Sequence, residues 1–290
     1  MNTSKMEIYD LLPNIFYPKT IFVNPAIDFD TIKEIENLNF PIIVKPDKGL
    51  RGMMVKLIHS LDDLKKHHQE TIVNYLIQEF IDFENEVGIF YVRNPKDDRG
   101  QITGIVKKVF LCLEGDGKST LKQLLKQDPR HELQLETLEK DPKIDLEKIL
   151  SIHEKINLVP FGNHTLGALF LDVSEQISPK LTHTIDKLCR QIDGFYYGRI
   201  DLKYKNWEEL EEGNHFSIIE INGAMSGPSH IYDPKHNYFW GIKEIMRHHN
   251  IMCEISIYNK SLGVNYLPFK KGIKEFKQHF ETISNFNIVR

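Results

Sequence analysis

Residues 198–222 read GRIDLKY, then KNWEELEEGNH, then FSIIEIN. The two outer segments are rich in Ile, Leu, Tyr and Phe and flank a polar segment, which predicts two strands joined by a turn. Side chains alternate between the faces of a strand, so Arg199 and Asp201 share one face, and Glu220 and Asn222 share another. If the strands pair with these faces aligned, one cation, two carboxylates and one amide oxygen converge.

This set of side chains suggests a magnesium site. Mg²⁺ prefers hard oxygen ligands and is commonly held by a few carboxylates together with substrate phosphates. An arginine beside it can neutralise charge on a phosphoryl group during transfer. An exposed hairpin with ordinary surface charges is the alternative. The apolar neighbours of Glu220, namely Ile218, Ile219 and Ile221, argue against it, because a carboxylate in such a setting needs a cation or hydrogen bonds.

The R-x-D and E-x-N pairs, followed by the small residues of 222–228 (NGAMSGP), resemble the metal-binding end of the ATP-grasp ligases, with D-alanine–D-alanine ligase as the nearest likeness. The resemblance implies that Asp201, Glu220 and Asn222 hold two Mg²⁺ ions, a role that Mn²⁺ can also fill. It also implies that Arg199 stabilises the transferring phosphoryl group and later the tetrahedral oxyanion.

The composition is that of an ordinary globular protein. The chain has 290 residues, of which 41% are hydrophobic and 27% charged, and its net charge is −4. This charge gives no case for binding nucleic acid or an anionic membrane. No apolar run approaches the roughly 20 residues of a membrane span. Three single cysteines (Cys112, Cys189 and Cys253) and no signal-peptide pattern lead us to expect a reducing cytoplasm.

Further motifs extend the resemblance toward the N-terminus. Residues 40–46 (FPIIVKP) predict a buried strand that carries Lys45, and Gly49, Arg51 and Gly52 lie in the loop after it. In ATP-grasp proteins this lysine contacts the nucleotide phosphates and the loop folds over them. D-alanine ligases have serines in this loop, so Arg51 departs from their pattern. Lys5, before a short helix, matches another phosphate lysine; a solvated terminal lysine is an equal alternative.

The segment 75–92 matches the hinge that binds the base in ATP-grasp proteins. A predicted strand ends at Glu79, and a polar turn leads to Glu86 and a second strand. The resemblance implies that Glu79, Phe80 and Ile81 present backbone groups to the adenine. It also implies that Glu86 accepts hydrogen bonds from the ribose and that Ile219 belongs to the nucleotide site.

The predicted strand 102–113 carries Lys107 and Lys108. Adjacent residues of a strand point in opposite directions, so only one of the two lysines can face the phosphates. The other is expected to be solvated or paired with an acidic residue. The sequence alone leaves the choice between them open.

Residues 115–120 (GDGKST) invite comparison with a P-loop, but the first glycine of that motif is replaced by Cys112. We therefore reject a P-loop. The segment resembles one in cyanophycin synthetase and fused glutathione synthetases, which are also ATP-grasp enzymes. As ordinary structure it is a turn with Ser119 as helix N-cap.

The residues after Asn222 are the candidates for substrate contacts. In the ligases the corresponding loop holds the acceptor carboxylate, which points to Ser226, Ser229 and His230. His164 is a further candidate, although a lone histidine is more often a structural hydrogen-bonding residue. Elsewhere, the patterns predict a helix over residues 27–38 and a helix followed by a strand over 238–256.

The resemblance implies an α+β fold with residues 1–290 as one ATP-grasp domain, in which two α/β subdomains with antiparallel sheets grip ATP. The small subdomain is expected at about 20–78, the larger at about 79–270, with an insertion at 114–160. The N-terminal domain that precedes the ATP-grasp core in most of these ligases is expected to be missing.

The expected activity is an ATP-dependent carboxylate–amine or carboxylate–thiol ligase that forms an acyl phosphate and releases ADP. Its partners would be ATP and a small carboxylate or peptide-like substrate, with a second copy or a partner protein completing the substrate site. Two alternatives stay open: an ATP-grasp small-molecule kinase, and a nucleotide-binding regulatory module without turnover.

Overall fold

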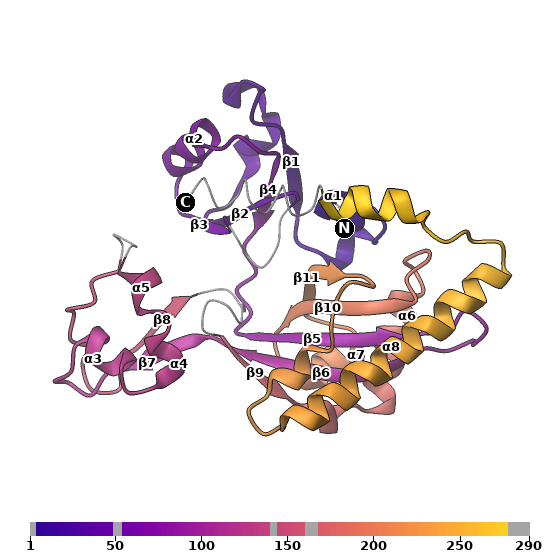
Figure 1. Ribbon diagram of the computed structural model, residues 1–290. Coiled ribbons are helices and arrows are strands. Elements are labelled where there is room, and N and C mark those ends of the chain that lie inside the picture. Colours follow the sequence, from indigo (N-terminus) through magenta and orange to yellow (C-terminus); the bar gives the residue numbers. More distant parts are fainter. Residues whose placement is uncertain (1–3, 49–53, 140–143, 160–167, 278–290) are drawn as a thin grey trace.

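The computed structural model describes residues 4–48, 54–139, 144–159 and 168–277. In these ranges the chain forms two larger antiparallel sheets with helices around them, as expected for the α+β class (Figure 1). No helix in the described ranges combines the length and hydropathy that a membrane crossing requires.

The smaller sheet comes from the N-terminal part of the chain and has the order β1-β4-β2-β3. Its strands are β1 (Thr20–Val23), β2 (Ile42–Pro46), β3 (Lys56–Ile58) and β4 (Tyr75–Glu79). Helix α2 (Leu61–Glu70) begins at Ser60, whose side chain accepts a hydrogen bond from the backbone N–H of Asp63. Val44, Leu64 and Ile77 form the buried centre of this layer.

The expected helix over residues 27–38 is wrong. Two short 3₁₀ turns stand there, η2 (Phe29–Thr31) and η3 (Lys33–Asn37). They are separated by Ile32, whose ψ of 90° is not helical. Phe29, Ile32 and Ile35 are buried against the small sheet in spite of the break. Apolar residues three positions apart fit a 3₁₀ turn as well as an α-helix, so the pattern could not distinguish between the two.

The larger sheet has the order β11-β10-β5-β6-β9, with every neighbouring pair antiparallel. Its strands are β5 (Asn85–Val92), β6 (Gln101–Val109), β9 (Leu169–Asp172), β10 (Tyr197–Tyr204) and β11 (Phe216–Asn222). The 198–222 stretch therefore supplies two adjacent strands at one edge, joined through α7 (Trp207–Glu212).

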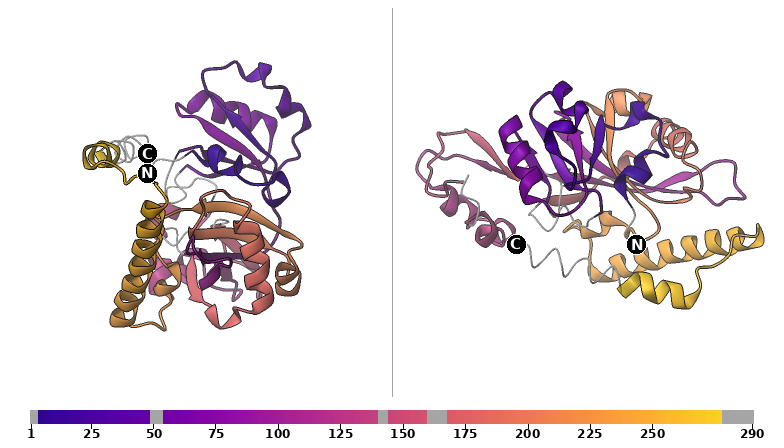
Figure 2. Two further views of the ribbon diagram at one scale, coloured as in Figure 1. Left: turned by 90° about the vertical axis from the view of Figure 1, so that its right-hand side faces the viewer. Right: turned by 90° about the horizontal axis from the view of Figure 1, so that it is seen from above.

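Helices cover both faces of the larger sheet (Figure 2). Helix α6 (Pro179–Cys189) and α7 pack on one face, where Ile89 and Ile200 point into the main core. Helix α8 (Tyr238–Ser261) lies on the other, where its Ile255 packs with Phe90 and Tyr197. The prediction of a helix followed by a strand over residues 238–256 is wrong, because α8 is one continuous helix. Arg199 and Asp201 lie on the α8 face by the alternation of the strand.

A third, separate group of elements leaves the larger sheet after β6. It contains β7 (Leu111–Glu114), α3 (Leu121–Leu125), α4 (Pro129–Glu132), α5 (Leu135–Leu138) and β8 (Lys155–Val159), and it projects to the side in Figure 1. It has its own apolar core, which includes Leu121, Leu125 and Leu150. The GDGKST turn belongs to it. The cap of α3 is Thr120 and not Ser119, because the Ser119 hydroxyl bonds Asp116 instead.

Helix α1 (Lys5–Tyr9) lies between the two larger sheets (Figure 1). Its Tyr9 is buried in the main core together with Leu76 of the small sheet and Ile221 of β11. Three single-turn 3₁₀ helices complete the described elements: η1 (Asn14–Phe16), η5 (Ser174–Gln176) and η6 (Ser229–Tyr232). The short N-terminal helix thus connects the layers that the site uses.

Candidate active site

The pairing of β10 with β11 brings the R-x-D and E-x-N side chains to one face. Arg199 lies opposite Asn222, and Asp201 lies opposite Glu220. Directly opposed residues of an antiparallel pair have Cβ atoms about 4.5–5.5 Å apart. The alignment of faces on which the sequence argument depended is therefore the one that the strands adopt.

Arg199 and Asp201 form a buried, two-point ion pair. The arginine Nε donates to Asp201 Oδ1 at 2.6 Å, and Nη2 donates to Oδ2 at 2.9 Å. A third donor, Nη1, bonds the hydroxyl oxygen of Ser229. Burial acts to raise the pKa of Asp201, but Arg199 and Lys108 outweigh it and hold the pKa below its usual value. Asp201 is therefore an ionised oxygen donor with a fixed orientation.

The choice between Lys107 and Lys108 is decided by the direction of the side chains. Lys108 is buried, and its Nζ lies 2.6 Å from Glu86 Oε1 and 3.2 Å from Asp201 Oδ2. Burial opposes its charge, but the two carboxylates outweigh this effect and raise its pKa. Lys107 points to the opposite face and is partly exposed. Lys108 therefore lies with the other predicted site residues, whereas Lys107 points away from them.

Glu220 differs from Asp201 because none of the described side chains pairs with it directly, although its charge acts to raise the pKa values of the nearby Lys5 and Lys45. In the part of the chain that the structure describes, its side chain has no hydrogen bond or ion pair, and it is partly exposed. Asn222 donates a long hydrogen bond of 3.5 Å to Asp201 Oδ2. The donor set thus combines one rigid carboxylate with one carboxylate that is free to accept a ligand.

A β-bulge at Ile219 connects the two sheets. Asp201 pairs with Glu220, but Leu202 pairs with Ile218, so Ile219 is the extra residue of β11. Its carbonyl oxygen accepts hydrogen bonds from the Tyr9 hydroxyl and, at 3.2 Å, from Lys45 Nζ. Lys45 belongs to the small sheet, so this contact brings a phosphate-lysine candidate to the edge of the metal-ligand face.

Lys45 is held in a polar but buried setting. Its Nζ donates to the Tyr9 hydroxyl and to Gln78 Oε1, both at 2.8 Å. Burial lowers the pKa of Lys45 to about 8, although the nearby Glu220 acts in the opposite direction. The lysine is therefore a buried cation that a polyanion would stabilise further. Tyr9 and Gln78 were not predicted as site residues, since they approach Lys45 only in the folded chain.

Lys5 occupies the position that the resemblance implies, beside the end of β2. Its Nζ donates to the carbonyl oxygens of Pro46 at 3.1 Å and Asp47 at 3.4 Å. Burial lowers the pKa of Lys5, and the charge of Glu220 partly restores it. Lys5 is thus a partly buried lysine near Glu220. Gly49, Arg51 and Gly52 of the predicted phosphate loop lie outside the described residues.

The hinge segment follows β4. Glu79 is exposed and its backbone N–H donates to the carbonyl of Lys19 at 2.9 Å, while Phe80 and Ile81 are partly buried. The carbonyl oxygen of Ile81 accepts a hydrogen bond from Lys203 Nζ at 3.0 Å, and the same ammonium lies 5.2 Å from the centre of the Phe80 ring. Lys203 was missed, although it lies two residues beyond Asp201 on the same face of β10.

Glu86, predicted to bind the ribose, is buried and paired with Lys108. Gly88, on the same strand as Glu86, leaves space for the ion pair of Arg199 with Asp201. A Cβ at Gly88 would lie 2.8 Å from Asp201 Oδ1, 2.9 Å from Val106 and 3.0 Å from Arg199 Cδ. Only glycine lets β5 lie directly beneath the ion pair. This is a further site feature that the sequence did not reveal.

The residues predicted to contact the substrate differ in what they contact. Ser229 contacts Arg199 directly, as described above. Ser226 bonds the carbonyl oxygens of Asn222 and Gly223 and so closes the turn after β11. His230 is buried, and its Nε2 lies 3.0 Å from Glu244 Oε1 of α8. His164 lies outside the described residues.

Comparison with known proteins agrees with this picture over part of the chain. Residues 10–94 match the family model of the RimK-like ATP-grasp domain. Over 69 residues the chain is 36% identical to the coenzyme gamma-F420-2:alpha-L-glutamate ligase of Methanococcus maripaludis. That stretch is 23% of this chain and 24% of the relative, so most of the relative is not matched. The chain resembles the ATP-grasp superfamily, as the motifs predicted.

Solved structures give similarities of the same kind. D-alanine–D-alanine ligase from Bacillus anthracis has a TM-score of 0.48 at 14% identity, covering 89% of this chain and 68% of that one. A bifunctional glutathione synthetase from Pasteurella multocida has a TM-score of 0.43 at 11% identity, covering 84% and 36%.

Proposed function

We propose that the protein is an ATP-dependent ligase that activates a carboxylate as an acyl phosphate and joins it to an amine. The observation that carries this proposal is the register that sets Asp201 opposite Glu220 and Arg199 opposite Asn222. It gathers oxygen donors and a guanidinium at the edge where Lys45 of the other sheet arrives. The match of residues 10–94 to an ATP-grasp domain supports the same proposal.

The charges of the site suit a nucleoside triphosphate. Four cations, Lys5, Lys45, Lys108 and Arg199, lie among the carboxylates of Asp201, Glu220 and Glu86. Lys45 is buried and Lys5 is partly buried, and burial lowers the pKa of both, so a phosphate that accepts from them relieves a desolvation cost. Both are the proposed phosphate contacts.

The donor set fits Mg²⁺ and not a softer metal. Asp201, Glu220 and Asn222 offer only oxygen, and the unpaired Glu220 carboxylate can take a cation without losing another partner. Magnesium held by these residues would offset the negative charge of the phosphates. Arg199 keeps Asp201 ionised and oriented, and Lys108 holds Asp201 and Glu86 together.

The proposed reaction has two steps. A substrate carboxylate oxygen attacks the γ-phosphorus of ATP, the bond to the bridging oxygen breaks, and ADP leaves. An amine nitrogen then attacks the acyl carbon, and phosphate leaves with the bonding electrons and takes up the proton that the amine loses. Arg199, the guanidinium beside the metal ligands, stabilises the charge that develops in each step. Positioning of the carboxylate supplies much of the remaining acceleration.

For the amine we propose an amino acid, with L-glutamate as the first to test. The name of the partly matched relative states that it is a glutamate ligase. Ser226 and Ser229, which follow the metal-ligand strand, are the proposed contacts for a substrate carboxylate.

The decisive experiment is trapping with hydroxylamine. The protein is incubated with Mg-ATP and a panel of carboxylic acids and peptides, with and without L-glutamate, and ADP and hydroxamate are measured. A ligase gives ADP together with a hydroxamate, whereas a small-molecule kinase gives ADP and a stable phosphorylated product. A regulatory module gives neither. Glu220→Gln should remove both signals, and Glu254→Gln on the exposed side of α8 should keep them.

A further inference from the structure

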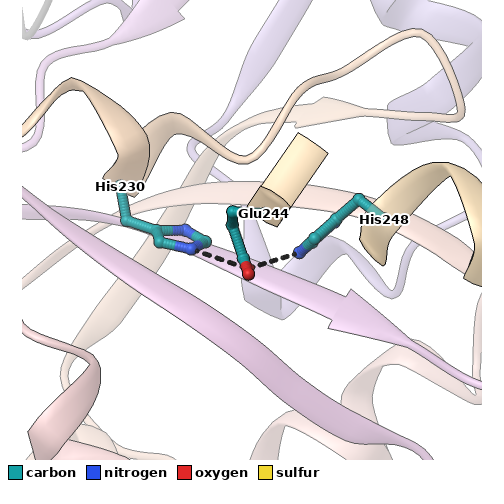
Figure 3. A group of neighbouring side chains, drawn as sticks. All are labelled: His230, Glu244 and His248. Carbon is teal, nitrogen blue, oxygen red and sulfur yellow. Dashed lines mark hydrogen bonds and ion pairs between the residues drawn. The ribbon is translucent and has the colours of Figure 1, made fainter. Parts of the chain in front are cut away.

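A second group of ligand-type side chains lies on the α8 face, apart from the magnesium-type oxygens. His230 of η6 and His248 of α8 flank Glu244, which stands one helical turn before His248 (Figure 3). His230 Nε2 lies 3.0 Å from Glu244 Oε1, and His248 Nε2 lies 3.2 Å from the same oxygen. The three atoms are all within 4.8 Å of one another.

We propose that His230, Glu244 and His248 form a binding site for a divalent transition metal of the zinc class. Two imidazoles and a carboxylate suit Zn²⁺ and its neighbours, and not Mg²⁺. Bonds of about 2.0–2.1 Å in a tetrahedron separate neighbouring donor atoms by about 3.3 Å. The 3.0 and 3.2 Å separations are close to that spacing. With three protein ligands, a fourth position is left for water or a substrate atom.

The donors are positioned before any metal binds. A Cβ at Gly104 would lie 2.2 Å from His230 Cε1 and Nδ1, so the glycine provides the space in which this ring rests. The ring of His248 packs edge-on against Phe90, and its Nδ1 lies 3.4 Å from the Tyr197 hydroxyl, a contact that can orient the ring.

Arg247 is the group that competes with a metal. Its Nη2 lies 2.5 Å from Glu244 Oε1 and 3.2 Å from His248 Nε2. The guanidinium thus supplies positive charge at the spot where a metal would bind. Its side chain is 43% exposed, so it can move into solvent when a stronger cation arrives. This competition distinguishes the proposal from a purely structural network, in which Arg247 would only stabilise the cluster.

The site is chemically independent of the proposed ligase reaction. Its donors are not shared with Asp201, Glu220 or Asn222, although Ser229, which precedes His230, contacts Arg199. Metal binding can therefore be measured without nucleotide. A negative result would overturn this proposal and leave the proposed ligase function to its own test.

The experiment is a titration of the full chain, stripped of metal with a chelator, with Zn²⁺ against a chromophoric competitor and with Co²⁺ followed by its visible spectrum. We expect one equivalent bound, and the absorption of four-coordinate Co²⁺. Glu244→Gln and His248→Ala should lose at least about 100-fold in affinity, because losing a ligand costs more than losing an orienting partner. His249→Ala, on the same helix but exposed, is the matched control.

Arg247→Gln should bind Zn²⁺ more tightly than the parent chain, because the competing cation is gone. Circular dichroism and melting temperatures check that each variant is folded. If His248→Ala does not fold, the near-isosteric Glu244→Gln still tests the proposal. The proposal is wrong if the parent chain binds no metal, if His249→Ala weakens binding as much as His248→Ala, or if Arg247→Gln weakens it.

Discussion

Lys45 Nζ donates to the carbonyl oxygen of Ile219 across 3.2 Å, joining the small sheet to the edge strand of the large one. The bulge in β11 leaves this carbonyl without a ladder partner, and the Tyr9 hydroxyl reaches the same oxygen. One buried cation therefore contacts both layers, at the level of Glu220. Its charge state should affect both the protein's stability and its affinity for nucleotide.

Replacing Lys45 by methionine should weaken ATP binding by about 10- to 100-fold, since a hydrogen bond to a charged group contributes about 1.5–3 kcal/mol. Adenosine binding should change much less, because the lysine acts on phosphates. Isothermal titration with both ligands measures the difference. Equal losses for ATP and adenosine would contradict the assigned role.

The lowered pKa of Lys45 predicts a pH dependence. The folded protein releases this proton near pH 8, whereas the unfolded chain keeps it to about 10.5. Between these values the unfolded state binds more protons, so this group makes the free energy of unfolding rise with pH. ATP affinity should do the opposite and fall above pH 8, because the neutral amine no longer attracts phosphate. Lys45→Arg, which stays charged, should flatten the fall in affinity.

The two carboxylates of the proposed metal site should respond differently to mutation. Glu220→Gln removes a carboxylate that has no direct ion pair among the described residues but acts electrostatically on Lys5, Lys45 and Arg199, so we expect a smaller loss of stability than for Asp201→Asn while Mg-dependent turnover disappears. Asp201→Asn breaks a buried pair with Arg199 and Lys108 and should cost about 3–5 kcal/mol of stability in addition to activity. Urea unfolding and ADP release, measured on both variants, test the contrast. Equal stability losses would contradict it.

Strand alternation depends only on local geometry, so the sequence predicted that Arg199 shares a face with Asp201 and that Glu220 shares one with Asn222. The condition that the two pairs meet on one face is met only through the register of β10 with β11. The sequence did not predict the bulge at Ile219, since an extra residue in a strand has no local pattern here. Contacts between distant segments, such as Lys45 with Tyr9 and His230 with Glu244, are formed only by the fold. The same alternation could have identified Lys203, which repeats the spacing from Arg199 to Asp201.

Gly88→Ala tests the space beneath the ion pair. The added Cβ would approach Asp201 Oδ1 to 2.8 Å and Arg199 Cδ to 3.0 Å, so the pair must shift. We expect a loss of about 1–3 kcal/mol in stability, typical of overpacking, and a larger loss of turnover than of ATP affinity. Gly241→Ala is the control, because a Cβ there meets only Ile231 Cβ at 4.0 Å. A fully active Gly88→Ala would show that the geometry of the pair is not critical.

The last prediction concerns Lys203, which ties β10 to the hinge through the Ile81 carbonyl at 3.0 Å. Burial lowers its pKa, and Glu86 and Asp82 partly offset this effect. Lys203→Met keeps the length of the side chain but removes the donor and the charge beside Phe80, so the hinge loses its hydrogen bond to the sheet. We expect several-fold weaker binding of both ATP and adenosine, because the proposed hinge contacts the base that they share. Lys45→Met should spare adenosine, so the ATP/adenosine affinity ratio separates the two lysines. Lys205→Met is the matched control, since that exposed lysine pairs only with Glu209 at 3.3 Å among the described residues. If Lys203→Met weakens ATP alone, the lysine acts on phosphates and the hinge assignment is wrong.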